Sequence, residues 1–179
     1  MARSKALADR SVPGAGPGRA VVTGIVLAAA ALAAFAVWFQ WRQTRRCLAF
    51  YGVAAARGIQ AAPRAELWTL AVDPATRRLV ATDRRDITAA RGLVHLRRGL
   101  VEDANFAWGP PGSAALPPDA WDEAIAFFPE GDQSPVAVVA FDLDGAGWAT
   151  VVGRPGRVSL GRLRAGLRTW VEATRAAPR

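Results

Sequence analysis

Two acidic residues stand at a spacing that enzymes use. Asp142 and Asp144 are separated by one residue and follow an apolar run, in the stretch VVAFDLDG at 138–145. Two neighbouring carboxylates can divide a hydrolysis between them, because one attacks as a nucleophile while the other transfers a proton. The apolar residues before Asp142 have the composition of a buried strand. The pattern is therefore compatible with a hydrolytic site at the end of a strand.

This stretch resembles the first motif of the haloacid-dehalogenase-like phosphatases, in which an apolar strand precedes Asp-x-Asp-Gly. The resemblance implies a nucleophile at Asp142, an acid/base at Asp144, and a magnesium ion held with a lysine and further acids. It covers about eight residues, and Ala146 stands where the family has a threonine. A β-hairpin also requires such a sequence, because glycine at 145 and 147 tolerates positive φ. We predict a hairpin rather than a phosphatase site.

His95 is the only histidine of the chain and lies beside Arg97 and Arg98. A histidine acting as a general base needs an orienting acid, and the acids considered for this role are Asp83, Asp86 and Glu102. This constellation is the basis of an alternative function, a membrane-tethered hydrolase. A helical histidine among arginines is more often a solvated side chain, so we predict no catalytic residue.

The single cysteine, Cys47, excludes an intramolecular disulfide. One cysteine and one histidine do not form the usual zinc sets, and the acids show no calcium-loop spacing. We therefore predict no metal site and no cofactor, and we expect a protein that is not an enzyme.

The longest apolar segment runs from Ala20 to Phe39 and contains no ionisable side chain. Twenty residues of helix are about 30 Å long, which matches the hydrocarbon thickness of a bilayer. Trp38 and Trp41 lie at the end of this segment, where aromatic residues are expected at the membrane interface. We predict a transmembrane helix at 20–41, acting as a signal anchor, after a flexible basic tail at 1–19. The alternative is a signal peptide cleaved after the Ala-Phe-Ala sequence at 34–36.

The arginine-rich composition is typical of a bacterium of high GC content, so the expected location is the inner membrane. Basic residues flank the apolar segment about equally, which leaves the orientation open by the positive-inside rule. Because long domains translocate largely regardless of their charge, we expect the soluble part on the extracytoplasmic side. Gly24 and Ala28 form a small-xxx-small pair, through which two copies could associate as a homodimer.

The sequence after residue 41 predicts an α+β domain at 64–179, preceded by a juxtamembrane amphipathic helix at 42–63. We expect about five antiparallel strands in two hairpin regions, with two or three helices packed on them. The first predicted hairpin pairs strand 67–72 with strand 78–82. A single strand follows at 126–128, and the second predicted hairpin spans 136–152. Three helices are predicted in this domain. The first begins at Asp86 or Thr88, the second spans 119–124, and the third spans 159–173 with Ser159 as its N-cap.

Charge is distributed in blocks along the chain. Residues 42–98 have a net charge of +8, residues 99–153 of −9, and residues 154–179 of +6. We expect these blocks to attract one another within the fold. The basic face of the last helix, with Arg162, Arg164 and Arg168, is also a possible contact for anionic lipid. We expect no nucleic acid partner, because acids interrupt the arginines and no binding motif accompanies them.

These features predict a single-pass membrane protein of the bacterial cell envelope. The lipid bilayer is its expected partner through residues 20–41, together with another membrane or envelope protein. The leading hypothesis is a non-catalytic interaction or assembly module. A pilin-like or pseudopilin subunit of a secretion system is the second, because an apolar helix leading into an antiparallel sheet is the pilin architecture.

Overall fold

The computed structural model describes residues 17–109 and 121–178. The chain forms two compact units, residues 1–41 and residues 42–179. The long helix α1 (Pro17–Tyr51) accounts for the described part of the first unit and contributes its last residues to the second. The two units are described separately below.

Within the first unit, α1 is long and apolar enough to cross a membrane. Its most hydrophobic 18-residue window has a mean hydropathy of 2.5, and none of that window is buried. The large apolar side chains between Val21 and Trp41 are each 47–69% exposed. A soluble helix would cover such side chains against a core. The helix is therefore a candidate for a membrane anchor or a signal sequence, which share this character.

The second unit contains one antiparallel sheet of six strands, in the order β2-β1-β3-β4-β5-β6. Its strands are β1 (Arg64–Val72), β2 (Leu79–Asp86), β3 (Glu123–Phe128), β4 (Ala137–Asp142), β5 (Trp148–Val151) and β6 (Val158–Ser159). The predicted α+β class is confirmed, but the strand count is six and not five. The unpredicted strand is β6, whose two residues pair with Trp148 and Ala149. Two residues are too few to show an alternating pattern.

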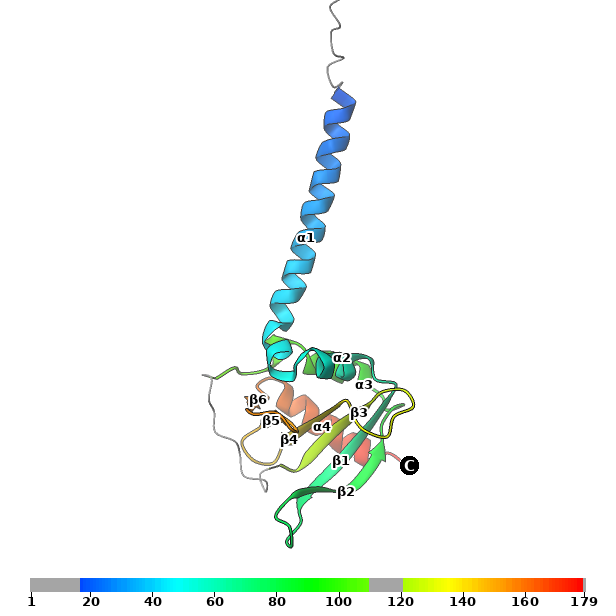
Figure 1. The fold of residues 1–179 in the computed structure, drawn as a ribbon, viewed down its shortest axis with the longest axis vertical. Helices are drawn as coiled ribbons and strands as arrows, with labels where there is room; N and C mark the ends of the chain where they lie inside the picture. The colour runs from blue at the N-terminus through cyan, green and yellow to red at the C-terminus, as the bar shows by residue number, and fades with distance from the viewer. Residues whose placement is uncertain (1–16, 110–120, 179) are drawn as a thin grey trace, which may run out of the picture. The chain divides into compact units, whose positions relative to one another are not determined.

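Helices cover one face of this sheet (Figure 1). They are the end of α1, α2 (Val53–Ala61), α3 (Leu93–Leu100) and α4 (Leu163–Ala176), with a 3₁₀ turn η1 (Asp103–Asn105) after α3. Leu67, Ile125, Val139 and Val151 are paired in register across four strands and point into this core. Leu100, from α3, joins them and is fully buried. The apolar side chains on one face of the strands pack here against the apolar faces of the helices.

The predicted helix at 42–63 is in two pieces, because Gly52 interrupts it with a φ of +76°. Only glycine adopts this backbone conformation without strain. The guanidinium of Arg154 donates to the carbonyl of Tyr51 at the end of α1. A β-carbon at position 52 would overlap that guanidinium. A distant arginine thus caps α1 where the chain turns into α2.

The prediction of a helix at 119–124 is wrong for the residues of this range that the structure describes. Glu123 and Ala124 belong to β3, whereas residues 119–120 lie outside the described part of the chain. β3 is a central strand that pairs with both β1 and β4, and all six of its side chains are buried. A strand buried on both faces lacks the polar alternation by which a half-exposed strand is recognised.

Two predicted helix starts are also corrected. Ser159 lies in β6, and α4 begins at Leu163, because Gly161 turns the chain at a φ of +51°. Asp86 accepts the N–H of Thr88 in a local turn, and α3 begins only at Leu93, after Gly92. In both places a residue type that often caps a helix lies elsewhere, Ser159 in a strand and Asp86 in a local turn. The predicted hairpins at 67–82 and 136–152 are confirmed as β1–β2 and β4–β5.

Candidate functional site

The acidic pair at 142 and 144 is built into the β4–β5 turn. Asp142 is buried and accepts the N–H groups of Gly145 (2.7 Å) and Ala146 (2.8 Å). Asp144 is exposed and pairs with Arg168 of α4. These contacts are those of a hairpin whose first acid closes its own turn. In the described residues, no group of three or more acidic, histidine or cysteine side chains is arranged to hold a metal ion.

A third carboxylate, just before β3, supports the same turn. Asp122 accepts the N–H groups of Leu143 (2.9 Å) and Asp144 (2.8 Å). Burial, opposed by these hydrogen bonds, raises the pKa of Asp122. The cluster of acids near β4 is therefore held by backbone donors, and its geometry has a structural explanation.

His95 lies on the exposed side of α3. Among the acids considered for orienting it, Glu102 pairs with Arg98 and accepts from the amide of Asn105, and Asp86 accepts from Thr88. The geometry therefore gives no support to a histidine–carboxylate pair that uses either acid.

Two arginines of α4, Arg164 and Arg168, contact the β4–β5 turn. Arg164 donates to the carbonyls of Leu143 and Gly145, and Arg168 pairs with Asp144 and Glu172. Arg162 is exposed. Two of the three arginines predicted to meet anionic lipid therefore have partners within the domain, and the lipid contact stays a prediction.

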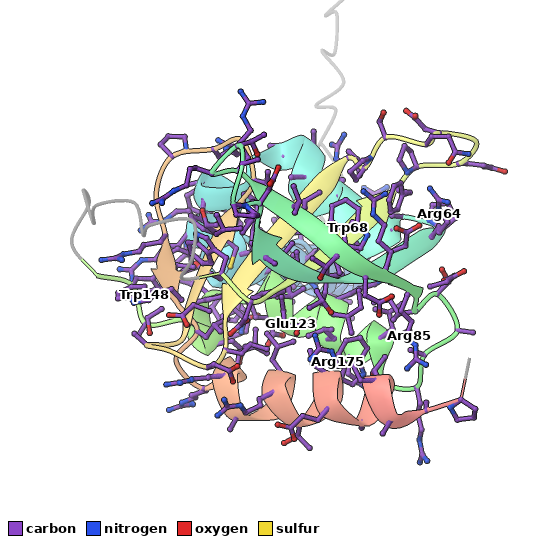
Figure 2. The ribbon with its side chains drawn as sticks, turned by 90° about the horizontal axis from the view of Figure 1, so that it is seen from below. Arg64, Trp68, Arg85, Glu123, Trp148 and Arg175 are labelled. Carbon is purple, nitrogen blue, oxygen red and sulfur yellow. The ribbon has the colours of Figure 1, made fainter. Side chains whose placement is uncertain are left out.

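The end of α4 is fastened to the sheet by ionic contacts that the sequence did not predict. Arg175 pairs with the buried Glu123 of β3 and donates to the hydroxyl of Thr69 (2.7 Å). Arg85 of β2 donates to three carbonyls at the end of α4, those of Thr174, Arg175 and Ala177. Figure 2 shows Arg85, Glu123 and Arg175 close together beside α4. Strand and helix are locked together there.

The other face of the sheet carries aromatic rings covered by arginines. Arg84 lies over Trp68 at 4.6 Å and Arg157 over Trp148 at 4.3 Å, measured from the guanidinium carbon to the ring centroid. The Trp68 indole also donates to Glu66 (2.8 Å). Register places Trp68 opposite Arg84 on β2, on the face away from the helices (Figure 2). Arginine stacking reduces the exposed apolar area of this face.

Two adjoining hollows lie on either side of the segment 88–90, which connects β2 to α3. The first, the α2–α3 hollow, has a volume of about 480 Å³. Its lining residues are Gln60, Ala62, Pro63, Thr88, Ala89, Ala90, Leu93, Val94, Arg97 and Arg98. The second, the β2–α4 hollow, has a volume of about 630 Å³. Its lining residues are Arg84, Arg85, Asp86, Thr88, Ala89, Ala90, Arg91, Thr174, Ala177 and Pro178.

Among the described residues these hollows are a candidate binding site, since they combine concave apolar walls with several positive charges. Sequence reasoning missed them. The signal in the sequence was the density of arginine between 84 and 98, which contains five arginines and one acid. Comparison with protein-family models, with curated proteins and with solved structures finds no match for this chain.

Proposed function

We propose that this protein is a non-catalytic interaction or assembly module, anchored by a single transmembrane helix in the inner membrane of a bacterium. The anchor is the apolar part of α1, residues 20–41. The domain that follows lies on the extracytoplasmic side and binds another envelope protein.

The exposure of the apolar side chains of α1 carries the proposal. Eleven large apolar residues between Val21 and Trp41 have about half or more of their surface uncovered. Apolar surface of that extent is unfavourable in water, and a bilayer removes it from water. The uninterrupted helical hydrogen bonding meets the further requirement that backbone polar groups be satisfied inside lipid.

Two observations favour interaction over catalysis in the domain. Of the two acids that resemble a phosphatase motif, Asp142 is engaged by the backbone of a turn and Asp144 pairs with Arg168, so both have a structural role. The domain also offers concave, arginine-lined hollows of a size suited to side chains of a partner. Both observations concern residues of the second unit alone.

Membrane attachment is tested with the full chain carrying one epitope tag at each end. We expect both tags to stay in the membrane pellet after alkaline carbonate extraction, because an inserted helix resists it. Loss of the amino-terminal tag from the mature protein would support the cleaved signal peptide instead. Treatment of spheroplasts with protease tests the side. We expect digestion of the carboxy-terminal tag, while its protection would place the domain in the cytoplasm.

The interaction function is tested by photo-cross-linking in cells. A benzophenone amino acid replaces Val94, which is 77% exposed in the α2–α3 hollow, or Val152, which is 55% exposed beyond β5. We expect adducts with a different polypeptide from Val94 and not from Val152. A ladder of cross-linked copies of this chain would favour the pilin-like alternative. Absence of adducts from every exposed position of residues 42–179 would contradict the proposal.

A further inference from the structure

The arginines around the two hollows differ in what they already bind. Arg85 donates to three carbonyls of α4, so its guanidinium is committed to the fold. Arg98 pairs with Glu102 at 3.8 Å on the surface. Arg91 and Arg97 have no carboxylate within ion-pair distance among the residues that the structure describes. The one acid of the lining, Asp86, accepts hydrogen bonds from its own turn.

Arg97 is the informative case, because its charge is partly buried without a counter-ion. Its guanidinium donates one long hydrogen bond, to the carbonyl of Gln60 at 3.4 Å, and lies over the Phe127 ring at 5.5 Å from the centroid, while its Nε is buried without a hydrogen-bond partner. Burial lowers the pKa of Arg97. Removing a charge from water is costly unless an opposite charge compensates for it. An anion bound in the α2–α3 hollow would provide that compensation.

The walls of the hollows restrict the kind of anion. The α2–α3 hollow is lined by Ala62, Pro63, Leu93 and Val94, and the shared segment adds Ala89 and Ala90. A small inorganic anion would leave these apolar walls in contact with water. A chain that carries carboxylates and small apolar side chains alternately would satisfy both the arginines and the walls. Because the hollows adjoin, an extended chain can occupy one and continue into the other.

We propose that the two hollows bind an acidic segment of a partner protein, with aspartate or glutamate carboxylates paired to Arg97 and Arg91 and small apolar side chains against the exposed Val94 and Pro63. This inference rests on the proposed interaction function and names the site and the chemistry of its partner. The arginine excess of the lining is complementary to such a segment.

The inference is tested by fluorescence anisotropy with the full chain in nanodiscs of zwitterionic lipid. The probe is a labelled ten-residue peptide in which glutamate alternates with alanine and valine, and the comparison peptide has glutamine in place of glutamate. We expect saturable binding of the glutamate peptide only, weakening as salt is added. Arg97→Gln is expected to weaken it at least about tenfold, and Arg91→Gln about threefold or more. Arg78→Gln, an exposed arginine distant from the lining, is the matched control and should bind as the wild type does.

Thermal unfolding of each variant separates binding from folding. Arg97→Gln should unfold at the same temperature as the wild type or higher, because it removes a partly buried charge that has no counter-ion among the described residues. If it unfolds at a lower temperature, Arg91→Gln, at an exposed position, decides the question alone. Equal binding of the glutamate and glutamine peptides, or equal affinity of the wild type and Arg91→Gln, would overturn the inference.

Three further outcomes are informative. Binding of inorganic phosphate or of anionic vesicles that Arg97→Gln weakens, without binding of the peptide, would assign the hollow to a phosphate group and overturn the acidic-segment inference. If the peptide fails to bind while Val94 still cross-links to another polypeptide in cells, this inference fails and the proposed interaction function stands. If neither is observed, both fail.

Discussion

Glu123 is an acid in an environment that favours its neutral form. Its side chain is 6% exposed, one oxygen pairs with Arg175, and the other has no hydrogen-bond partner. Burial raises the pKa of Glu123 from 4.5 to about 7, and Asp122 and Asp144 add to this effect, whereas Arg175 opposes it. Between these pH values the folded chain holds a proton that the unfolded chain has released. The stability from this group is therefore present at low pH and is lost as the pH rises towards 7.

We expect Glu123→Gln to abolish this pH dependence. Relative to the variant, the free energy of unfolding of the wild type should fall by up to about 3 kcal/mol between pH 4.5 and pH 7 and stay level above that. The measurement is urea denaturation of the detergent-solubilised chain, followed by tryptophan fluorescence at pH 5 and pH 8. Glu130→Gln, in the exposed β3–β4 turn, is the control and should follow the wild type. A difference between wild type and Glu123→Gln that is the same at both pH values would contradict the assigned pKa.

Single residues differ in how far the sequence predicts them. The hairpin role of Asp142 was predictable, because Asp-Gly and a second glycine between apolar runs specify a tight turn. The environments of Glu123 and Arg97 were not. Each depends on contacts made over long sequence separations, such as Glu123 with Arg175 and Arg97 with Gln60. Periodicity within one segment carries no information about such contacts.

At the scale of elements, the break between α1 and α2 depends on Gly52. Its backbone conformation, with φ of +76° and ψ of 156°, is almost exclusive to glycine. We expect Gly52→Ala to lower the free energy of unfolding by about 1–3 kcal/mol, because it adds backbone strain and displaces Arg154. Denaturation by urea measures this loss.

Gly166→Ala is the matched control. Gly166 lies inside α4, and a β-carbon there would meet nothing within 4 Å. Alanine is a better helix former than glycine by about 0.5–1 kcal/mol, so this variant should be more stable than the wild type. Destabilisation of both variants to the same degree would show that the position of Gly52 in the fold is not the cause.

The elements that were predicted correctly are those with a complete local signal. The β1–β2 hairpin has alternating side chains and an Asp-Pro turn, in which Asp73 accepts the N–H of Ala75 (2.9 Å). By contrast, β3 was assigned in part to a helix because it is buried on both faces. The strand order was also not predictable, since β1 and β3 pair across more than fifty residues of intervening chain.

At the scale of the whole molecule, the charge blocks of the sequence meet in the fold of the second unit. The acidic stretch 99–153 supplies Glu123 and Asp144, and the basic end supplies their partners Arg175 and Arg168. Their complementarity was predicted from net charge alone. Of the arginines in the hollows, Arg91 and Arg97 have no ion pair with any described residue, whereas Arg85 and Arg98 are engaged within the fold.

We expect residues 42–179 to behave as a water-soluble domain when separated from the apolar segment. In Triton X-114 phase separation, this fragment should enter the aqueous phase, whereas the full chain should enter the detergent phase. The reason is that the second unit has its own sheet and core, while most of the exposed large apolar side chains lie in the first. Recovery of the fragment in the detergent phase, or as an aggregate, would contradict this division. The full chain carrying Gly166→Ala is the control, and it should enter the detergent phase as the unaltered full chain does.

The position of β2 at the edge of the sheet has a consequence for crowding. Anchored proteins are confined to a plane, where copies meet at high local concentration, and an open strand edge can then join sheets of different copies into aggregates. The second half of β2 is Asp83-Arg84-Arg85-Asp86, four consecutive charged residues that oppose pairing with another strand. Under the proposed membrane anchoring, replacement of these residues by threonine or valine would remove that protection and allow neighbouring copies to polymerise through β2.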